Sequence, residues 1–156
     1  MKAQCEMELE SKYQLPQKLL ALSHAKTWEK AKLEWVDINN FWWEENYCLC
    51  GHSIIENCEI VNTKNGSSAI VGNCCIKKFN KQLNSHLLFS GYRKILKDET
   101  KSLNATLINW CYVKGILNEE EREFYMSIRN KRKLTLLQLN MKIKINLRVI
   151  RFISKR

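Results

Sequence analysis

The stretch that decides the fold runs from residue 48 to residue 76 and reads CLCGHSIIENCEIVNTKNGSSAIVGNCCI. It holds five of the chain's seven cysteines. Thiolates are soft ligands that suit Zn²⁺, and four of them complete a tetrahedral structural site. Cysteines that are merely buried would scatter along the chain, as Cys5 and Cys111 do. The odd cysteine total and this clustering therefore predict a metal site rather than disulfides.

The choice of ligands follows from the spacing of these cysteines. Adjacent cysteines rarely both reach one ion, so only one of Cys74 and Cys75 is expected to bind. Cys75 is preferred because it opens a predicted helix, where backbone N–H groups favour a thiolate. The predicted ligands of a structural Zn²⁺ are Cys48, Cys50, Cys58 and Cys75, with His52 as the substitute for Cys58 or Cys50.

A β-hairpin is predicted between the two ends of this stretch. Residues 58–62 and 67–71 read as strands on either side of Asn65-Gly66, a pair that supplies the positive φ angles of a tight turn. The order of cysteine turn, hairpin and ligand at a helix start resembles a treble-clef zinc finger. The spacing differs from the usual two CxxC pairs, since it has one CxC, a lone Cys58 and one adjacent pair.

Helical patterns dominate the rest of the chain. Pro16 can occupy the first position of an amphipathic helix predicted over 16–35. Capping-box spacing at Asn118/Glu121 and Thr135/Gln138 marks two further helix starts. The last segment also alternates like a strand, and its capping box favours the helix. The predicted C-terminal helices span residues 84–97, 102–115, 119–131 and 135–152.

The aromatic segment 41–47 can be interpreted as a hydrophobic lid on the zinc module, or alternatively as a surface that stacks on bases. The fold class predicted from these patterns is α+β: a treble-clef-like zinc module with a β-hairpin, flanked by an N-terminal helix and a C-terminal helical bundle. The predicted domains are a helical segment (1–40), a zinc-binding hairpin module (41–83) and a basic helical region (84–156).

The charge of the chain is concentrated at its C-terminal end. The net charge is +10 overall, whereas residues 81–156 hold seventeen basic and six acidic side chains. This excess of positive charge predicts a polyanion partner. Each phosphate that a cation neutralises releases counterions, and this release favours binding. The alternative is a solvated surface that only keeps the protein in solution. The residues predicted to contact DNA or RNA are Arg129, Lys131, Arg132, Lys133, Lys142, Lys144, Arg148 and Arg151.

Short motifs also resemble a family of small zinc modules from bacteria, plasmids and phages. In the cysteine stretch they are Cys48-x-Cys50-Gly51-His52-x-Ile54, Ile60-x-Asn62, Asn65-Gly66 and Val71-Gly72-Asn73-x-Cys75-Ile76-x-x-Phe79. A helical module appended to some DNA-processing proteins is similar to Ser102-Leu103-Asn104, Glu123-Phe124-Tyr125 and Arg132-Lys133-Leu134-Thr135-x-x-Gln138. The resemblance covers about residues 34–147. It implies an accessory role on a mobile element or phage, without an assigned reaction.

Enzymatic function classes find little support in the sequence. No HExxH, P-loop, GxGxxG, GxSxG or zinc-deaminase pattern is present. Residues 58–80 contain no histidine, which argues against an HNH-type nuclease. We therefore expect a non-enzymatic nucleic-acid-binding protein, with a nuclease or other metalloenzyme as a weaker possibility.

A protein-binding module is the main alternative. Such an inhibitor or adaptor would dock on a host or defence nucleoprotein complex, because tryptophans often anchor protein interfaces. Its anchors would be Trp28, Trp35, Trp42 and Trp43. A cytoplasmic location, where thiols stay reduced, is expected because no long apolar run and no secretory signal pattern is visible.

Overall fold

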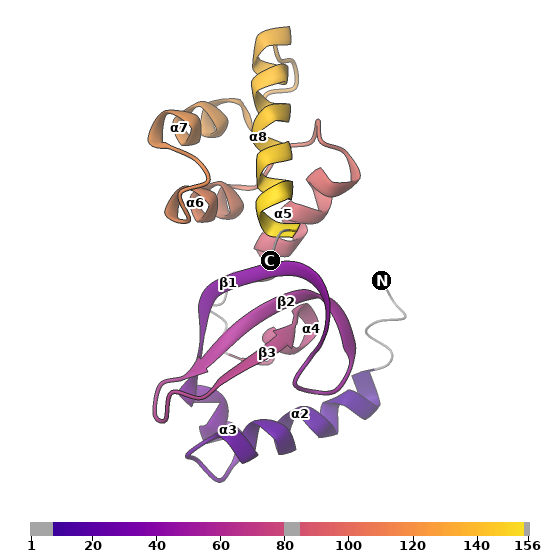
Figure 1. Ribbon diagram of the computed structural model, residues 1–156, viewed down its shortest axis with the longest axis vertical. Helices are drawn as coiled ribbons and strands as arrows, with labels where there is room; N and C mark the ends of the chain where they lie inside the picture. Colours follow the sequence, from indigo (N-terminus) through magenta and orange to yellow (C-terminus); the bar gives the residue numbers. More distant parts are fainter. Residues whose placement is uncertain (1–7, 80–84, 155–156) are drawn as a thin grey trace. The chain divides into compact units, whose positions relative to one another are not determined.

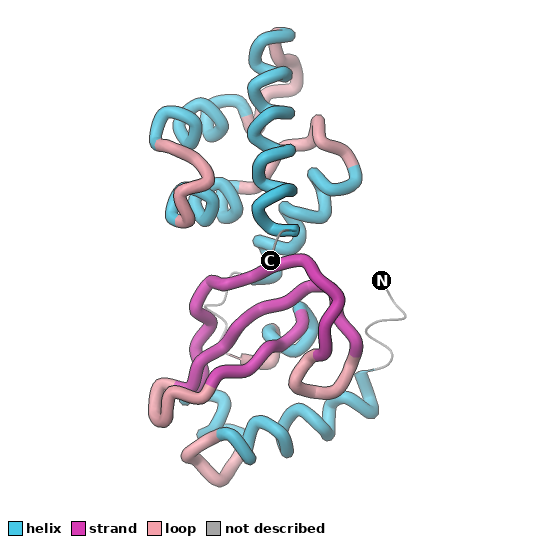
Figure 2. Tube along the Cα trace, viewed as in Figure 1, coloured by secondary structure: helices cyan, strands magenta, loops and turns pink. Residues whose placement is uncertain are grey.

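The structure is a computed structural model that describes residues 8–79 and 85–154. The chain divides into two compact units between Ser85 and His86. We call the part up to Ser85 the sheet unit and the part from His86 the helical unit. The described residues contain both helices and an antiparallel sheet, so the fold is α+β (Figure 2).

The sheet unit is built on an antiparallel sheet in the order β1-β2-β3 (Figure 1). Its strands are β1 (Trp35–Tyr47), β2 (Ser53–Asn62) and β3 (Ser68–Gly72). Its helical segments are α2 (Glu8–Leu22), α3 (Trp28–Ala31), the short 3₁₀ helix η1 (Lys32–Glu34) and α4 (Asn73–Ile76). The helix α4 lies against β2 and β3. The buried core of this unit includes Leu15, Leu19, Trp35, Ile60, Val71, Ile76 and Phe79.

The predicted hairpin is confirmed, with a different turn from the one expected. Of the Asn65-Gly66 pair only Gly66 has a positive φ, of 75°. The Asn65 side chain instead accepts the Ser67 N–H at 2.9 Å and donates to the Leu22 carbonyl at 2.9 Å. Asn65 therefore joins the hairpin turn to the end of α2. The residue preferences of turns could not predict this bond, because Leu22 is far from Asn65 in the sequence.

The single helix predicted over 16–35 is wrong at both ends: α2 runs from Glu8 to Leu22 with Pro16 in its interior, and only the short segments α3 and η1 are helical after it. The carboxylate of Glu34 accepts the N–H groups of His24 at 2.9 Å and Ala25 at 2.8 Å, and also the Asn62 side-chain amide at 2.9 Å. These bonds hold the two N–H groups in a loop after α2 instead of a continued helix. Glu34, ten residues after His24, therefore helps to end the helix. The spacing of apolar residues within the helix could not predict this contact.

The strand β1 was not predicted, although it is rich in the aromatic and β-branched residues that favour strands. It starts at Trp35, inside the segment expected to be helical, and continues through the aromatic segment 41–47. Phe41 and Trp42 are buried, which fits a hydrophobic cover better than a base-stacking surface. The pairing with β2 is interrupted twice, and the Asn57 side chain donates to the Glu44 carbonyl at 2.7 Å near the second interruption.

The helical unit contains α5 (Ser85–Lys97), α6 (Ala105–Val113), α7 (Glu119–Ile128) and α8 (Leu136–Ser154). Both predicted capping boxes are confirmed, at Asn118/Glu121 and at Thr135/Gln138. The helix predicted from residue 102 starts at Ala105, because the Asn104 side chain accepts the Leu107 N–H. Within the described residues, no helix has both the length and the apolar character needed to cross a bilayer.

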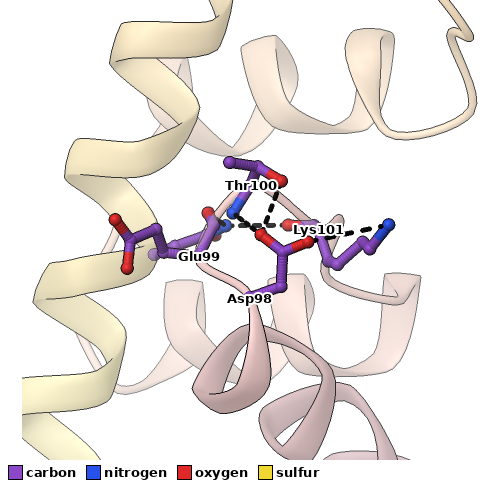
Figure 3. A network of polar contacts seen from close by, with 5 residues as sticks. Asp98, Glu99, Thr100 and Lys101 are labelled. Atoms are coloured by element: carbon purple, nitrogen blue, oxygen red, sulfur yellow. Dashed lines mark hydrogen bonds and ion pairs between the residues drawn. The ribbon is translucent and has the colours of Figure 1, made fainter.

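A buried asparagine joins α8 to the rest of the helical unit. The Asn146 side chain donates to the carbonyls of Glu99 at 2.7 Å and Lys101 at 2.8 Å, and its oxygen accepts the Tyr125 hydroxyl at 2.7 Å. Tyr125 in turn accepts the Leu103 N–H. The loop that Asn146 holds is itself closed by bonds from Thr100 to Asp98 (Figure 3). All of these polar groups are paired, which buried polar groups require.

The stability of the sheet unit is expected to depend on pH through Glu34. The amide of Asn62, followed by the two backbone N–H groups, lowers the pKa of Glu34 below its ordinary value of 4.5. A lowered carboxyl pKa contributes stability above the unfolded pKa and loses it as the pH falls through the folded value. Glu34→Gln should therefore melt lower than wild type at neutral pH, and the two melting temperatures should converge below pH 4.5. The exposed Glu45→Gln is the matched control, and a constant gap between Glu34→Gln and wild type would contradict this role.

The helical unit is expected to depend on Asn146. Asn146→Ala leaves two carbonyls and one hydroxyl without their partner, and each costs roughly 1–3 kcal/mol when buried. The free energy of unfolding should fall by about 3 kcal/mol or more, measured by urea unfolding followed by circular dichroism. Asn140→Ala, exposed on the same helix, should change it by less than about 0.5 kcal/mol. Equal effects of the two variants would contradict the network.

Candidate metal centre

A tight turn between β1 and β2 presents the first two cysteines of the site. The Cys48 N–H donates to the His52 carbonyl at 2.8 Å, and the Gly51 N–H donates to the Cys48 carbonyl at 2.8 Å. Gly51 has a φ of +100°, and a Cβ atom there would lie 2.9 Å from the Gln14 side chain. Only glycine meets both conditions without strain. The sequence Cys-x-Cys-Gly thus produces a compact turn with both thiols at its base.

The third cysteine reaches the same place from the segment that follows β3. The turn is attached to β3 by the Leu49 N–H, which donates to the Ile70 carbonyl at 2.8 Å. The Gly72 N–H donates to the Cys48 Sγ atom at 3.3 Å. Directly after Gly72 the chain enters α4, which carries Cys75. Two segments more than twenty residues apart are therefore held together by one backbone–backbone hydrogen bond and one bond from a backbone N–H to the Cys48 sulfur.

The Sγ atoms of Cys48, Cys50 and Cys75 all lie within 4.8 Å of one another, and all three residues are buried. Four ligands at about 2.3 Å from a tetrahedral ion would be about 3.8 Å apart, so the observed spacing is compatible with metal binding. These three cysteines can hold a metal ion.

The protonation of the three thiols is coupled. The hydrogen bond with Cys75 is the largest influence that lowers the pKa of Cys48, to about 5. The same bond and burial raise the pKa of Cys75, and burial raises that of Cys50. These influences favour loss of a proton at Cys48 over loss at Cys75 or Cys50. A divalent cation that displaced the thiol protons would replace a shared hydrogen bond with direct ligation.

The other predicted ligands lie in different positions. The His52 Nδ1 atom is 3.4 Å from the Cys50 Sγ atom, at the edge of the cluster. Cys58 is fully buried on β2 and is not part of the three-sulfur group. Burial, followed by the charge of Asp37, raises the pKa of the Cys58 thiol, which also bonds to Ser85. Cys74 is half-buried and outside the group, and Cys5 lies outside the described residues.

The predicted phosphate-binding cations differ in their exposure. Lys131, Arg132 and Lys133 are exposed in the connection between α7 and α8, and Arg129 is half-buried at the end of α7. Lys144, Arg148 and Arg151 are exposed and recur at the i, i+4, i+7 spacing of one helix face. Arg148 is ion-paired with Glu121 at 2.6 Å.

Lys142 differs from the other cations. Its residue is only 6% exposed, and burial lowers the pKa of its ammonium group. It belongs to the inner face of α8, together with Ile145 and Asn146. We predicted that Lys142 contacts phosphates because it lies in the basic C-terminal region. The helical period instead places it on the buried face of α8. Lys142 is therefore not presented for phosphate contacts.

The four tryptophans of the alternative prediction are also distributed unevenly. Trp35 and Trp42 are buried in the sheet unit. Trp28 and Trp43 are half-buried, and Trp28 packs edge-on against Phe79 with ring centroids 6.1 Å apart. At least two of the four proposed anchors are thus committed to the core.

Sequence reasoning missed the contribution of Gly72 to the site. Its N–H is a hydrogen-bond donor to Cys48, and a Cβ atom at this position would lie 2.9 Å from the Ile54 side chain. The Val-Gly-Asn run before the cysteine pair was a signal for a close approach of this kind.

Comparison of the chain with protein-family models, curated proteins and solved structures yields no match.

The metal site is expected to depend on three cysteines and not on the others. Cys48→Ser, Cys50→Ser and Cys75→Ser should each lose bound metal and weaken the packing of α4, measured by elemental analysis and circular dichroism. Cys58→Ser and Cys111→Ser, both buried outside the group, should keep the metal stoichiometry of wild type. His52→Ala should weaken metal retention against a chelator by about tenfold or more. Loss of metal in Cys58→Ser with retention in His52→Ala would instead make Cys58 the fourth ligand.

Proposed function

We propose that this chain is a non-enzymatic, zinc-stabilised protein that binds nucleic acid, in an accessory role on a phage or other mobile element. The proposal combines two independent parts. The first is a structural zinc ion in the sheet unit. The second is a phosphate-binding surface on the helical unit, which we call the basic surface and define as Arg129, Lys131, Arg132, Lys133, Lys144, Arg148 and Arg151.

Zinc is the metal that the donor set favours. Thiolate ligands select Zn²⁺ over Mg²⁺, Ca²⁺ and Mn²⁺, which prefer oxygen. We propose Cys48, Cys50 and Cys75 as three of the ligands and His52 as the fourth, since its Nδ1 atom lies close to Cys50 while Cys58 is outside the group. The cysteine turn, the β2–β3 hairpin and the ligand on α4 support a treble-clef-like arrangement.

A structural ion is favoured over a catalytic one. A catalytic zinc keeps one position open for water or substrate, whereas four protein ligands close the coordination shell. The three cysteines are buried, and the ion would join the β1–β2 turn to α4. Zinc bound there would add to the stability of the sheet unit, because the free energy of metal binding to a folded site contributes to folding.

Nucleic-acid binding is supported by one observation above all: between Arg129 and Ser154 the chain has no acidic residue, while six of its cations are exposed. Three of them, Lys131, Arg132 and Lys133, are consecutive in the connection that precedes α8. Consecutive cations without acidic neighbours produce a positive field that attracts phosphates. Because long side chains in a connecting loop reach a backbone rather than base edges, we expect weak sequence preference.

A protein partner remains the second candidate, on different residues from those first expected. Leu136 and Leu137 at the start of α8 are 76% and 71% exposed, directly after the consecutive cations. Large exposed apolar side chains next to a charged cluster are common at protein interfaces. This surface would take the place of the tryptophans, of which Trp35 and Trp42 are buried.

A salt titration of binding to duplex and single-stranded oligonucleotides tests the proposal. Affinity should fall steeply with salt, and Lys131→Gln/Arg132→Gln/Lys133→Gln should flatten the logarithmic slope by up to three contacts, each worth roughly 0.9 on duplex DNA. The fold should survive, because exposed charges contribute little to stability. The matched control is Lys94→Gln/Lys97→Gln/Lys114→Gln, three exposed lysines elsewhere in the helical unit.

Three results would argue against nucleic-acid binding through this surface. They are no binding at low salt, an unchanged slope in the first variant, or an equal change in the control. The protein-docking alternative would then lead. Elemental analysis of the same preparations tests the metal separately, and a folded protein without zinc would remove that part of the proposal.

A further inference from the structure

An open cavity of about 550 Å³ lies in the sheet unit, away from the cysteine cluster. It is lined by the loop after α2, by α3 and by the hairpin turn between β2 and β3, segments that lie side by side in Figure 1. Its volume falls in the range of small-ligand sites. Three lysines line it, one from each of these segments: Lys26, Lys30 and Lys64.

Glu34 connects the segments that line this cavity. Glu34 lines it and holds the loop after α2 through the N–H groups of His24 and Ala25, and the hairpin through Asn62. The Glu34 carbonyl also accepts the Thr63 N–H at 2.7 Å. The backbone of the cavity is therefore held by hydrogen bonds on both sides.

The charge of the cavity lining is unbalanced in favour of cations. Among the residues that the structure describes, none of Lys26, Lys30 and Lys64 has a carboxylate within ion-pair distance. The nearby Glu29 is paired with Lys32, and Glu34 is engaged by N–H donors. The sheet unit as a whole does not share this excess, because residues 1–85 hold ten lysines and ten acidic residues.

We propose that this cavity binds a phosphate group. The three ammonium groups supply charge and hydrogen bonds, and the Thr27 hydroxyl, which lines the cavity and caps no helix N–H, adds a neutral donor. Lysine is a compact charge that suits the tetrahedral oxygens of phosphate, whereas a planar carboxylate is best matched by the arginine fork, which this cavity lacks. The volume leaves room for the group that carries the phosphate.

This inference does not use the helical unit and goes beyond the function proposed above. The cavity residues and the basic surface share no member. Loss of oligonucleotide binding on changing Lys131, Arg132 and Lys133 would leave the cavity proposal standing. Equally, an empty cavity would not affect binding by the basic surface. The two proposals therefore fail separately.

The test is an NMR titration of the ¹⁵N-labelled full chain with inorganic phosphate at constant ionic strength. The backbone N–H signals of Ala25, Thr27 and Lys64 should shift and saturate. Lys26→Gln/Lys30→Gln/Lys64→Gln should weaken phosphate binding by about tenfold or more. The control Lys94→Gln/Lys97→Gln/Lys114→Gln should change it by less than about twofold, since distant exposed charges are screened.

The proposal is overturned if those signals do not saturate, if the cavity variant binds as tightly as wild type, or if the control weakens binding equally. Parallel titrations with thymidine 5′-monophosphate and a short oligothymidylate identify the source of the phosphate. Saturation of the same signals by the oligonucleotide assigns a nucleic-acid backbone, and saturation by the monophosphate alone assigns a terminal phosphate.

Discussion

The convergence of three sulfur atoms is the constraint on which the sheet unit depends. Cys48 and Cys50 come from the turn between β1 and β2, and Cys75 comes from α4, yet their Sγ atoms lie within 4.8 Å of one another. Two hydrogen bonds, from Leu49 to Ile70 and from Gly72 to Cys48, bring the two segments together. Because β3 runs beside this turn and leads directly into α4, its path places Cys75 near the other two thiols.

A second fixed point lies around Glu34, where one carboxylate joins the loop after α2 to the hairpin. Glu34 also frames the cavity for which we propose phosphate binding. The buried asparagine Asn146 has the same role in the helical unit, where it joins α8 to a loop and to Tyr125. Each unit is thus organised by polar groups that are fully paired, as burial demands.

The proposed functions occupy different parts of this framework. Zinc would strengthen a junction that backbone hydrogen bonds already define. The basic surface lies on the connection before α8 and on the exposed face of that helix, while Lys142 is turned into the core. The exposed Leu136 and Leu137 beside the consecutive cations make the same region a candidate for protein docking. The salt titration of oligonucleotide binding therefore tests a surface that has both exposed cations and exposed apolar side chains.

The sequence by itself determined the features that depend on near neighbours. The β2–β3 hairpin follows from two short strands around Asn65-Gly66, and the starts of α7 and α8 follow from capping residues three positions apart. The clustering of cysteines was likewise sufficient to predict a metal site. Such signals are readable because the interacting groups are separated by only a few bonds along the chain.

Only the tertiary structure decided which of these residues meet. α2 ends at Leu22 under the influence of Glu34, and β1 begins at Trp35, the last residue of the predicted helix. Cys58 is buried apart from the other thiols, and Lys142 faces inward. Each outcome depends on a partner far away in the sequence, whose hydrogen bond or burial outweighs a local preference of a few tenths of a kcal/mol per residue.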